Sequence, residues 1–251
     1  SFEDLENPDS NLATEIIASD GAILGKYFEQ NRSQLKYSDL PQNFVQALVA
    51  TEDERFYEHS GIDGRGTLRA IASLGTSGGA STLTQQLAKQ LFHGEGSKFL
   101  PFRIIQKAKE WIIAIRLERQ YTKNEIIAMY CNVYDFGNNS VGVNSAAKTY
   151  FSKEPKNLTI DESAILVGMF KNSGLYNPVK NPEGVRNRRN VVLKQMEKAE
   201  IITEAQKLKL QSLPIKLDFK LESHKDGTAT YFREYLREYM KKWVEDNKKP
   251  D

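Results

Sequence analysis

Three clusters of polar side chains have the types and spacing that catalysis could use, and the first contains a glutamate beside aromatic residues. It runs from Glu52 to Gly61 with the sequence EDERFYEHSG. If this segment is helical, Glu52, Phe56 and His59 fall along one stripe at positions i, i+4 and i+7. A carboxylate in such surroundings suits a general base or a general acid. The alternative, an ordinary amphipathic helix end with solvated acids, stays open on composition alone.

The second cluster is a glycine-rich turn that leads into a helix, with the sequence GGASTLTQQLAK at residues 78–89. Helical spacing places Ser81, Gln85 and Lys89 on one side and the leucines almost opposite. Burial of the leucines would therefore present a hydroxyl, an amide and an ammonium group together. A flexible loop followed by free helix N-terminal amides also suits an anion. A plain junction between a loop and a helix is the competing interpretation.

The third cluster lies on a helix predicted at about residues 102–120, which contains RIIQKAKEWIIAIRLER. Arg103, Lys107 and Glu110 share one face, which as a site would offer phosphate contacts and an acid. As a purely structural feature, the same face would be a set of solvated ion pairs. A neighbouring apolar stripe with heptad-like spacing is formed by Ile104, Ala108, Trp111 and Ile115.

The overall composition limits the classes of protein to consider. With 251 residues and 39% hydrophobic content, the chain can bury a core, and disorder is not expected. A net charge of +2 gives no global signal for nucleic acid, so no nucleic-acid partner is expected. The single cysteine and the scattered histidines lack metal-ligand spacing, and no metal site is predicted. The sequence contains no run of roughly 18 apolar residues, so it predicts no membrane span and no signal peptide. Both ends look like cut points in a longer protein.

Periodicity predicts a mainly helical chain with a minor β element near its N-terminus. Short apolar runs on either side of a turn at Asp20-Gly21 predict a β-hairpin over residues 13–28. An amphipathic helix is expected to begin at Pro41, and no βαβ alternation suggests a doubly wound sheet. Capping boxes predict three further helix starts, at Thr122 with Glu125, Thr159 with Glu162, and Thr203 with Gln206.

Taken in order, the three clusters and two later segments resemble the five motifs of glycosyltransferase family 51. The segments are ATEDERFYEHSGID, GGASTLTQQLAKQLF, QKAKEWIIAIRLERQYTKNEIIAMYCN, AAKTYFSK and FKNSGLYNPVKNPEGVRNRRNVVL. The likeness extends to DGAILGKYF near the N-terminus and to TATYFREYLREY near the C-terminus. It covers nearly the whole chain, and it is closer to the N-terminal half of class A bifunctional penicillin-binding proteins than to a monofunctional enzyme.

This resemblance implies a mainly α, lysozyme-like fold with a globular lobe, a smaller membrane-facing lobe and a minor N-terminal β-hairpin. Residues 1–38 would form an extended segment with the hairpin, and residues 39–212 would form the glycosyltransferase catalytic domain. Residues 213–251 would lead towards a transpeptidase domain of a parent protein. The family's location implies the periplasmic face of the inner membrane, with a transmembrane anchor that this sequence does not include.

The resemblance also implies a reaction, which is the polymerisation of lipid II into β-1,4-linked glycan strands with inversion. Glu52 would be the base that deprotonates the 4-hydroxyl of the acceptor sugar. That oxygen would attack C1 of the lipid-linked donor strand, and undecaprenyl pyrophosphate would leave. Glu110 would be the second essential carboxylate, and Lys89 and Lys107 would hold the pyrophosphate. The other substrate-binding positions carried over by motif are Asp53, Phe56, His59, Ser81, Thr82, Gln85 and Lys171.

Two positions depart from the family's pattern. Gln106 stands where family members commonly carry arginine, so one pyrophosphate-facing cation is missing. Arg103 lies one turn before the motif lysine on the same face, and we expect it to replace that cation. Gln90 stands where asparagine often follows the lysine of the second motif. Arg188 and Arg189, together with Lys171 and Asn177, match later motif positions, for which partly structural roles are expected.

The family further implies a divalent cation, magnesium or manganese, held mainly by the substrate's pyrophosphate. The expected partners are lipid II, the growing lipid-linked strand and the membrane surface. The apolar segment FLPF, at residues 99–102, is predicted to contact the bilayer, and a core-packing loop is the alternative.

Two other functions remain open on the sequence. A lysozyme-like, glycan-cleaving enzyme would share a helical fold and a key glutamate, but it would need no pyrophosphate-binding cations. A non-catalytic module that binds glycan or a divisome partner would be free to lose Glu52 and Glu110, and both are present.

Overall fold

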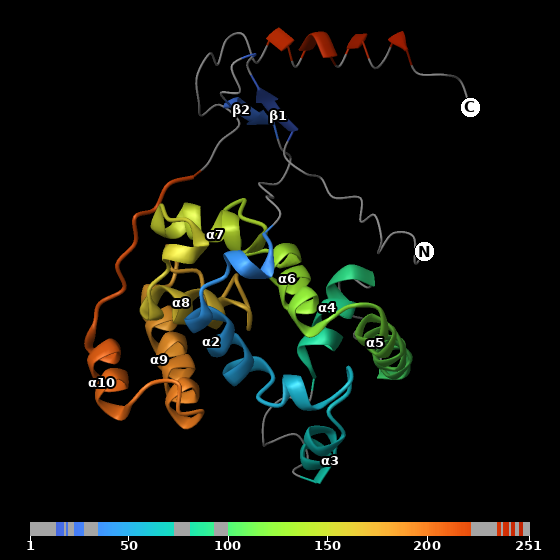
Figure 1. Cartoon of the computed structure of the whole chain (residues 1–251), viewed down its shortest axis with the longest axis vertical. Coiled ribbons are helices and arrows are strands. Elements are labelled where there is room, and N and C mark those ends of the chain that lie inside the picture. Colours follow the sequence, from blue (N-terminus) through green and yellow to red (C-terminus); the bar gives the residue numbers. More distant parts are fainter. Residues whose placement is uncertain are drawn as a thin grey trace.

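The computed structural model describes residues 14–17, 23–27, 35–72, 81–92 and 100–221, with residue 19 and short stretches between 235 and 247. Within these residues the chain is mainly α-helical, as predicted (Figure 1). The longer helices are α2 (Gln42–Glu52), α3 (Gly64–Ala72), α4 (Leu83–Phe92), α5 (Leu100–Gln120), α6 (Lys123–Val133), α7 (Gly142–Phe151), α8 (Ile160–Met169), α9 (Pro182–Lys198) and α10 (Glu204–Ser212). Short 3-10 helices occur at Tyr37–Asp39, Phe56–Glu58 and Pro155–Asn157.

The strand content of the described residues is one antiparallel pair near the N-terminus. Strands β1 (Thr14–Ile17) and β2 (Ile23–Tyr27) pair with Thr14 opposite Tyr27, where the turn at Asp20-Gly21 predicted a hairpin. A single isolated bridge joins Asp135 to Val141 between α6 and α7. Everything that positions the candidate site is therefore helix or loop.

The three capping boxes are confirmed as helix starts. Thr122, Thr159 and Thr203 are the N-cap residues of α6, α8 and α10, and each side chain accepts the backbone N–H three residues later. The glutamate or glutamine at that third position accepts the N–H of its threonine in return. Two otherwise unpaired backbone donors are satisfied at each start, which is why this local pattern predicts the boundary well.

Two helix boundaries differ from the prediction. Helix α2 ends at Glu52, and Asp53 has φ −158° and ψ 74°, so Glu52, Phe56 and His59 do not form a helical stripe. Helix α5 begins at Leu100, so the apolar segment at 99–102 lies mostly in a first helical turn and not in a loop. Residue 99 and the side chains of residues 100–102 lie outside the described part of the structure. The contact of this segment with the bilayer therefore stays a prediction.

The inward face of α5 also differs from the prediction. Glu110, Ala114 and Leu117 are buried, whereas Trp111 of the predicted apolar stripe is 36% exposed. Ala108 of the same stripe is exposed too. The packed face thus runs through Glu110, which brings a carboxylate to the interior side of the helix.

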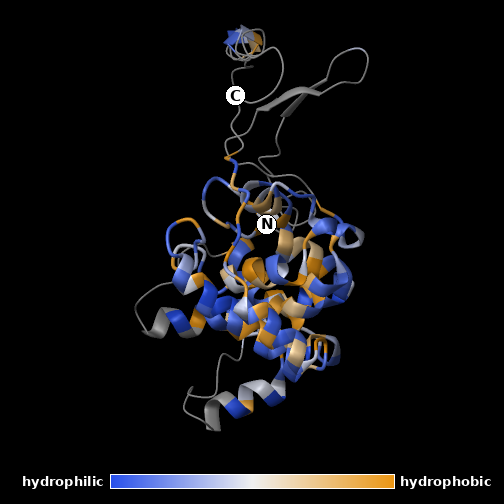
Figure 2. Cartoon of the chain, turned by 90° about the vertical axis from the view of Figure 1, so that its left-hand side faces the viewer, coloured by the Kyte–Doolittle hydropathy of each residue, from blue (hydrophilic) through white to orange (hydrophobic). Residues whose placement is uncertain are grey.

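The core forms around α8, which is apolar all round after an acidic first turn. Every residue from Ser163 to Met169 is buried, as expected for a helix without a polar face. Helix α8 packs against α2, α7 and α9, while α4 packs against α5 and α6 (Figure 1). The hydrophobic segments gather in the middle of the helical body and the hydrophilic ones face outward (Figure 2). Because α2 packs against both α8 and α9, its last residue, Glu52, is held by the core.

A buried arginine joins α8, α9 and α10. Arg189 is fully buried and donates to the Asp161 carboxylate at 3.0 Å and to the carbonyl oxygens of Leu213 and Gln211 at 2.9 and 3.1 Å. Burial lowers the pKa of Arg189 and raises that of Asp161, while each charge opposes the other's shift. A buried guanidinium with this many acceptors has a structural role, in agreement with the expectation for this motif position.

Candidate active site

Glu52 is the last residue of α2, and its carboxylate lies where α2, α4 and α9 meet. Gln86 of α4 donates to Oε2 and Arg188 of α9 to Oε1, each at 3.3 Å. The Glu52 side chain is 11% exposed. The carboxylate is thus held at both oxygens but not sealed off from solvent. A carboxylate has about four lone-pair positions, so room remains for an incoming hydroxyl.

Asp53 leaves the helix and joins the first motif to the second. Its Oδ2 accepts the backbone N–H of Leu83, the first residue of α4, at 2.9 Å. Its carboxylate oxygens also lie 3.0 and 3.1 Å from His59 Nε2. The Asp53 and His59 side chains are only 4% and 7% exposed, respectively. A negative charge at a helix N-terminus is favourable, so Asp53 fixes where α4 begins relative to the end of α2.

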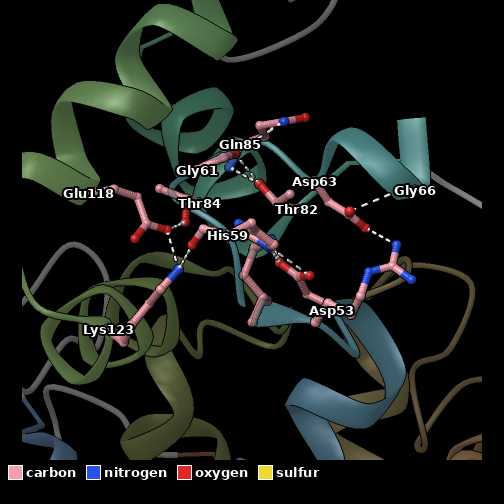
Figure 3. A network of polar contacts seen from close by, with 12 residues as sticks. Asp53, His59, Gly61, Asp63, Gly66, Thr82, Thr84, Gln85, Glu118 and Lys123 are labelled. Atoms are coloured by element: carbon pink, nitrogen blue, oxygen red, sulfur yellow. Dashed lines mark hydrogen bonds and ion pairs between the residues drawn. The ribbon is translucent and has the colours of Figure 1, made fainter. Parts of the chain in front are cut away.

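Thr82 and Gln85 fasten the start of α4 to the loop at Gly61 (Figure 3). The Thr82 hydroxyl donates to the Gly61 carbonyl at 2.7 Å and accepts the Gln85 N–H at 3.1 Å, so Thr82 caps α4. The Gln85 amide donates to the same carbonyl at 3.2 Å. Gly61 has φ +87°, and a Cβ there would lie 2.8 Å from the Ala114 carbonyl oxygen, so glycine is required.

These contacts change the prediction for one face of α4. Gln85 is buried, so Ser81, Gln85 and Lys89 are not presented together as expected. Gln86 instead reaches the carboxylate of Glu52. Any substrate contact of Thr82 or Gln85 stays a prediction, because their polar atoms serve the loop at Gly61 in this structure.

Lys123 holds the loop of the first motif from the other side (Figure 3). Its Nζ donates to the His59 carbonyl at 2.6 Å and to Glu118 Oε1 at 2.8 Å, and lies 4.2 Å from the centre of the Phe56 ring. The Thr84 hydroxyl donates to the same Glu118 oxygen at 2.6 Å. Phe56 and His59 are thereby fixed in the packing, consistent with the expectation that they shape the motif.

Asp63 closes the same loop before α3. Its carboxylate forms an ion pair with Arg55 and accepts the Gly66 N–H at 3.0 Å. Burial works to raise the pKa of Asp63, but the hydrogen bonds from Arg55 and Gly66 outweigh burial and keep that pKa below its ordinary value. The ionised carboxylate therefore caps the first turn of α3.

Ser81, Lys107 and Glu110 form the second polar group of the candidate site. Lys107 Nζ donates to the Ser81 hydroxyl at 2.8 Å and to Glu110 Oε2 at 2.9 Å. Glu110 is 6% exposed, whereas the Lys107 side chain is 38% exposed. The structure thus brings together three of the predicted residues, from the segment before α4 and from α5. Because an ammonium group has three protons, Lys107 retains one for a ligand oxygen.

Three predicted cations lie on the surface. Lys89, Arg103 and Lys171 are exposed, and their side chains form no hydrogen bond or ion pair with a described residue. No described contact brings Lys171 to the other site residues. Asn177, by contrast, is buried and accepts the backbone N–H of Val179, which is a structural role.

Two groups around Glu52 were not assigned to the site from the sequence. Gln86 was overlooked in favour of its neighbour Gln85, and Arg188 was expected to be partly structural. Arg188 is 136 positions from Glu52, so no local spacing connects them. The two adjacent glutamines were the signal that could have identified Gln86, because only one of them can face the core.

The fold and the site together define a mainly helical enzyme domain with two glutamates in the site. Glu52 accepts hydrogen bonds from Gln86 and Arg188, and Glu110 is paired with Lys107. The model of the transglycosylase family matches residues 20–197, and the chain belongs to this family.

Proteins similar to this chain support that assignment. Penicillin-binding protein 1A of Vibrio cholerae is 40% identical over 196 residues, which are 76% of this chain and 23% of that protein. Penicillin-binding protein 1F of Bacillus subtilis is 34% identical, over 92% of this chain and 32% of that protein. The crystal structure of penicillin-binding protein 1A from Haemophilus influenzae aligns with a TM-score of 0.51 and 25% identity, over 94% of this chain and 25% of that one.

The chain therefore spans less than a third of the length of these relatives. The chain is a peptidoglycan glycosyltransferase domain, similar to the corresponding part of penicillin-binding proteins 1A and 1F.

Proposed function

We propose that Glu52 is the general base of glycan polymerisation from lipid II. The observation that carries this proposal is the partly exposed carboxylate, fixed at one oxygen by Gln86 and at the other by Arg188. Glu52 removes the proton from the 4-hydroxyl of the acceptor sugar as that oxygen attacks C1 of the donor. The bond from C1 to the phosphate oxygen breaks, and undecaprenyl pyrophosphate leaves with the electron pair. Attack from the side opposite the leaving group inverts C1 and gives a β-1,4 bond.

Lys107 is proposed to meet the leaving pyrophosphate. Its ammonium group is held by Ser81 and Glu110 and has a third proton free, so it can stabilise negative charge as the leaving group departs. Glu110 in this account holds the ammonium group of Lys107 in place. Lys89 and Arg103 are exposed cations that would supply further phosphate contacts.

A divalent cation is proposed to enter with the substrate. Among the described residues, no three His, Cys, Asp or Glu side chains are grouped as a metal site would require. Pyrophosphate oxygens and water are the ligands that magnesium usually keeps in phosphate-transfer sites. The cation would neutralise the charge of the leaving pyrophosphate, and the protein's part would be Lys107 and its neighbours.

We further propose a lysozyme-like two-lobe arrangement, with the smaller lobe facing the outer surface of the cytoplasmic membrane. Leu68 of α3 and Ile105 and Ile112 of α5 are 69%, 53% and 56% exposed, which suits contact with lipid. None of the helices in the described ranges has the length and apolar character needed to cross a bilayer. A transmembrane anchor and a fused transpeptidase domain would belong to the parent protein.

The reaction is tested by incubating the chain and its Glu52→Gln variant with labelled lipid II, detergent and magnesium. We expect glycan ladders from the first and a loss of at least about 100-fold in rate from the second, because removal of a general base typically costs this much. Circular dichroism checks that the variant is folded. Cleavage of preformed glycan without any ladder would instead favour the lysozyme-like enzyme, and binding of glycan without either reaction would favour the binding module.

The replacement of the missing family arginine is tested at Arg103. Arg103→Ala should reduce lipid II turnover about tenfold, the effect of losing one charge-assisted contact to the pyrophosphate. Arg119→Ala is the matched control, because Arg119 is an exposed arginine at the other end of α5. Equal turnover by the two variants would remove Arg103 from the site.

The membrane contact is tested by replacing Phe99 and Leu100 with serine. Binding to liposomes that contain anionic lipid should weaken, because two large apolar side chains would no longer enter the bilayer. Liposome binding equal to that of the unchanged chain would show that this segment packs against protein.

A further inference from the structure

The side-chain amide of Gln86 is held at both of its ends. Its Nε2 donates to Glu52 Oε2 at 3.3 Å, and its Oε1 accepts the hydroxyl of Tyr130 at 2.9 Å. The ionised carboxylate can only accept, so the NH₂ end must face Glu52. The carbonyl end then remains for Tyr130, whose hydroxyl must act as the donor.

Tyr130 is a rigid support for this contact. Its side chain is fully buried on α6, and its ring stacks on Phe170 with centroids 4.7 Å apart and planes 21° apart. The start of α6 is fixed by its capping box and by Lys123, which binds the carbonyl of His59. The hydroxyl of Tyr130 therefore has one position, and that position lies beside Gln86.

The phenol is also held in its donor form. Burial raises the pKa of Tyr130 well above its ordinary value, and the nearby charge of Glu52 raises it further. The Glu52 carboxylate, which is paired with the Arg188 guanidinium, acts on the Tyr130 phenol, and so do the phenol of Tyr134 and the thiol of Cys131. Tyr130 is consequently neutral across the range in which the enzyme would work, and its proton is always available to Gln86.

We propose that Tyr130 is a positioning residue for the base, acting through the amide of Gln86 on the carboxylate of Glu52. This inference rests on the proposed role of Glu52. Tyr130 itself touches no reacting atom in this account. Its hydroxyl prevents the amide from turning by half a rotation, which would point the carbonyl of Gln86 at the carboxylate. With Gln86 on Oε2 and Arg188 on Oε1, the plane of the carboxylate is fixed at two points.

Steady-state kinetics with lipid II test this role. Tyr130→Phe keeps the ring and removes the hydroxyl, and it should lower kcat about tenfold with KM for lipid II within about twofold of the unchanged chain, since the loss is confined to the base. Tyr134→Phe is the matched control. It removes a hydroxyl from the same aromatic cluster, but one that donates to the Met169 carbonyl at 2.7 Å, and kcat should stay within about twofold.

A double-mutant comparison separates positioning from general support of the fold. In a Gln86→Ala background, Tyr130→Phe should cause no further loss of kcat, because its route to Glu52 is already cut. Independent losses that multiply in the double variant would overturn the proposal. So would an unchanged kcat in Tyr130→Phe, or an equal loss in Tyr134→Phe.

A spectroscopic readout tests the contact without any activity. The side-chain NH₂ signals of Gln86, assigned by their loss in Gln86→Ala, should shift when Glu52 is replaced by Gln. In Tyr130→Phe the same replacement should shift them much less. If the chain does not polymerise lipid II but this pattern appears, the proposed function fails and the positioning stands. If the Gln86 signals respond equally in both backgrounds, the positioning fails.

Discussion

The structure depends most on one buried carboxylate, that of Asp53. It accepts the first backbone N–H of α4 and contacts the ring of His59, and almost none of it is exposed. An anion at a helix N-terminus replaces a backbone partner that the helix lacks, which typically contributes about 0.5–2 kcal/mol. A buried charge without partners would cost much more. The Asp53 carboxylate and the first N–H of α4 therefore satisfy each other's hydrogen bonding. Helix α2 ends at Glu52, so that Asp53 can reach the start of α4.

The remaining parts of the site follow from this contact. Once α4 begins beside Asp53, Gln86 reaches the end of α2, and the segment before the helix brings Ser81 to Lys107 of α5. Helix α4 therefore contacts Glu52 through Gln86 in its first turn. The residue two positions before the helix, Ser81, contacts the pair formed by Lys107 and Glu110. The proposed base and the proposed pyrophosphate contact thus each receive one contact from α4 or from the segment directly before it. Gly61, with the carbonyl that Thr82 and Gln85 share, lets the loop pass close to α5 without a clash.

Local signals in the sequence predicted the helices well. The capping boxes at Thr122, Thr159 and Thr203 depend only on residues three positions apart, so they can be read without knowing the fold. The mainly α architecture and the family were predicted from the pattern of motifs, and both are confirmed. The division of the chain into segments and the roles of individual site residues stay predictions.

What failed was the inference of faces from periodicity. The stripe of Glu52, Phe56 and His59 was wrong because Asp53 caps a helix that starts 30 residues later, which no local pattern records. Gln85 was expected at the surface, but the Gly61 carbonyl provides a buried partner for its amide. On α5, burial of Glu110 in place of Trp111 became possible because Lys107 pairs with the carboxylate. In each case a tertiary polar contact overrode the apolar pattern.

The rate of lipid II polymerisation by Asp53→Asn tests this account most directly. Asparagine has nearly the same shape, but it lacks the charge and cannot accept at both oxygens. The account predicts a loss of at least about tenfold in a protein that remains folded, as expected when a charge-assisted buried contact is removed. A rate within about twofold of the unchanged chain would contradict the claim that this carboxylate holds the site together.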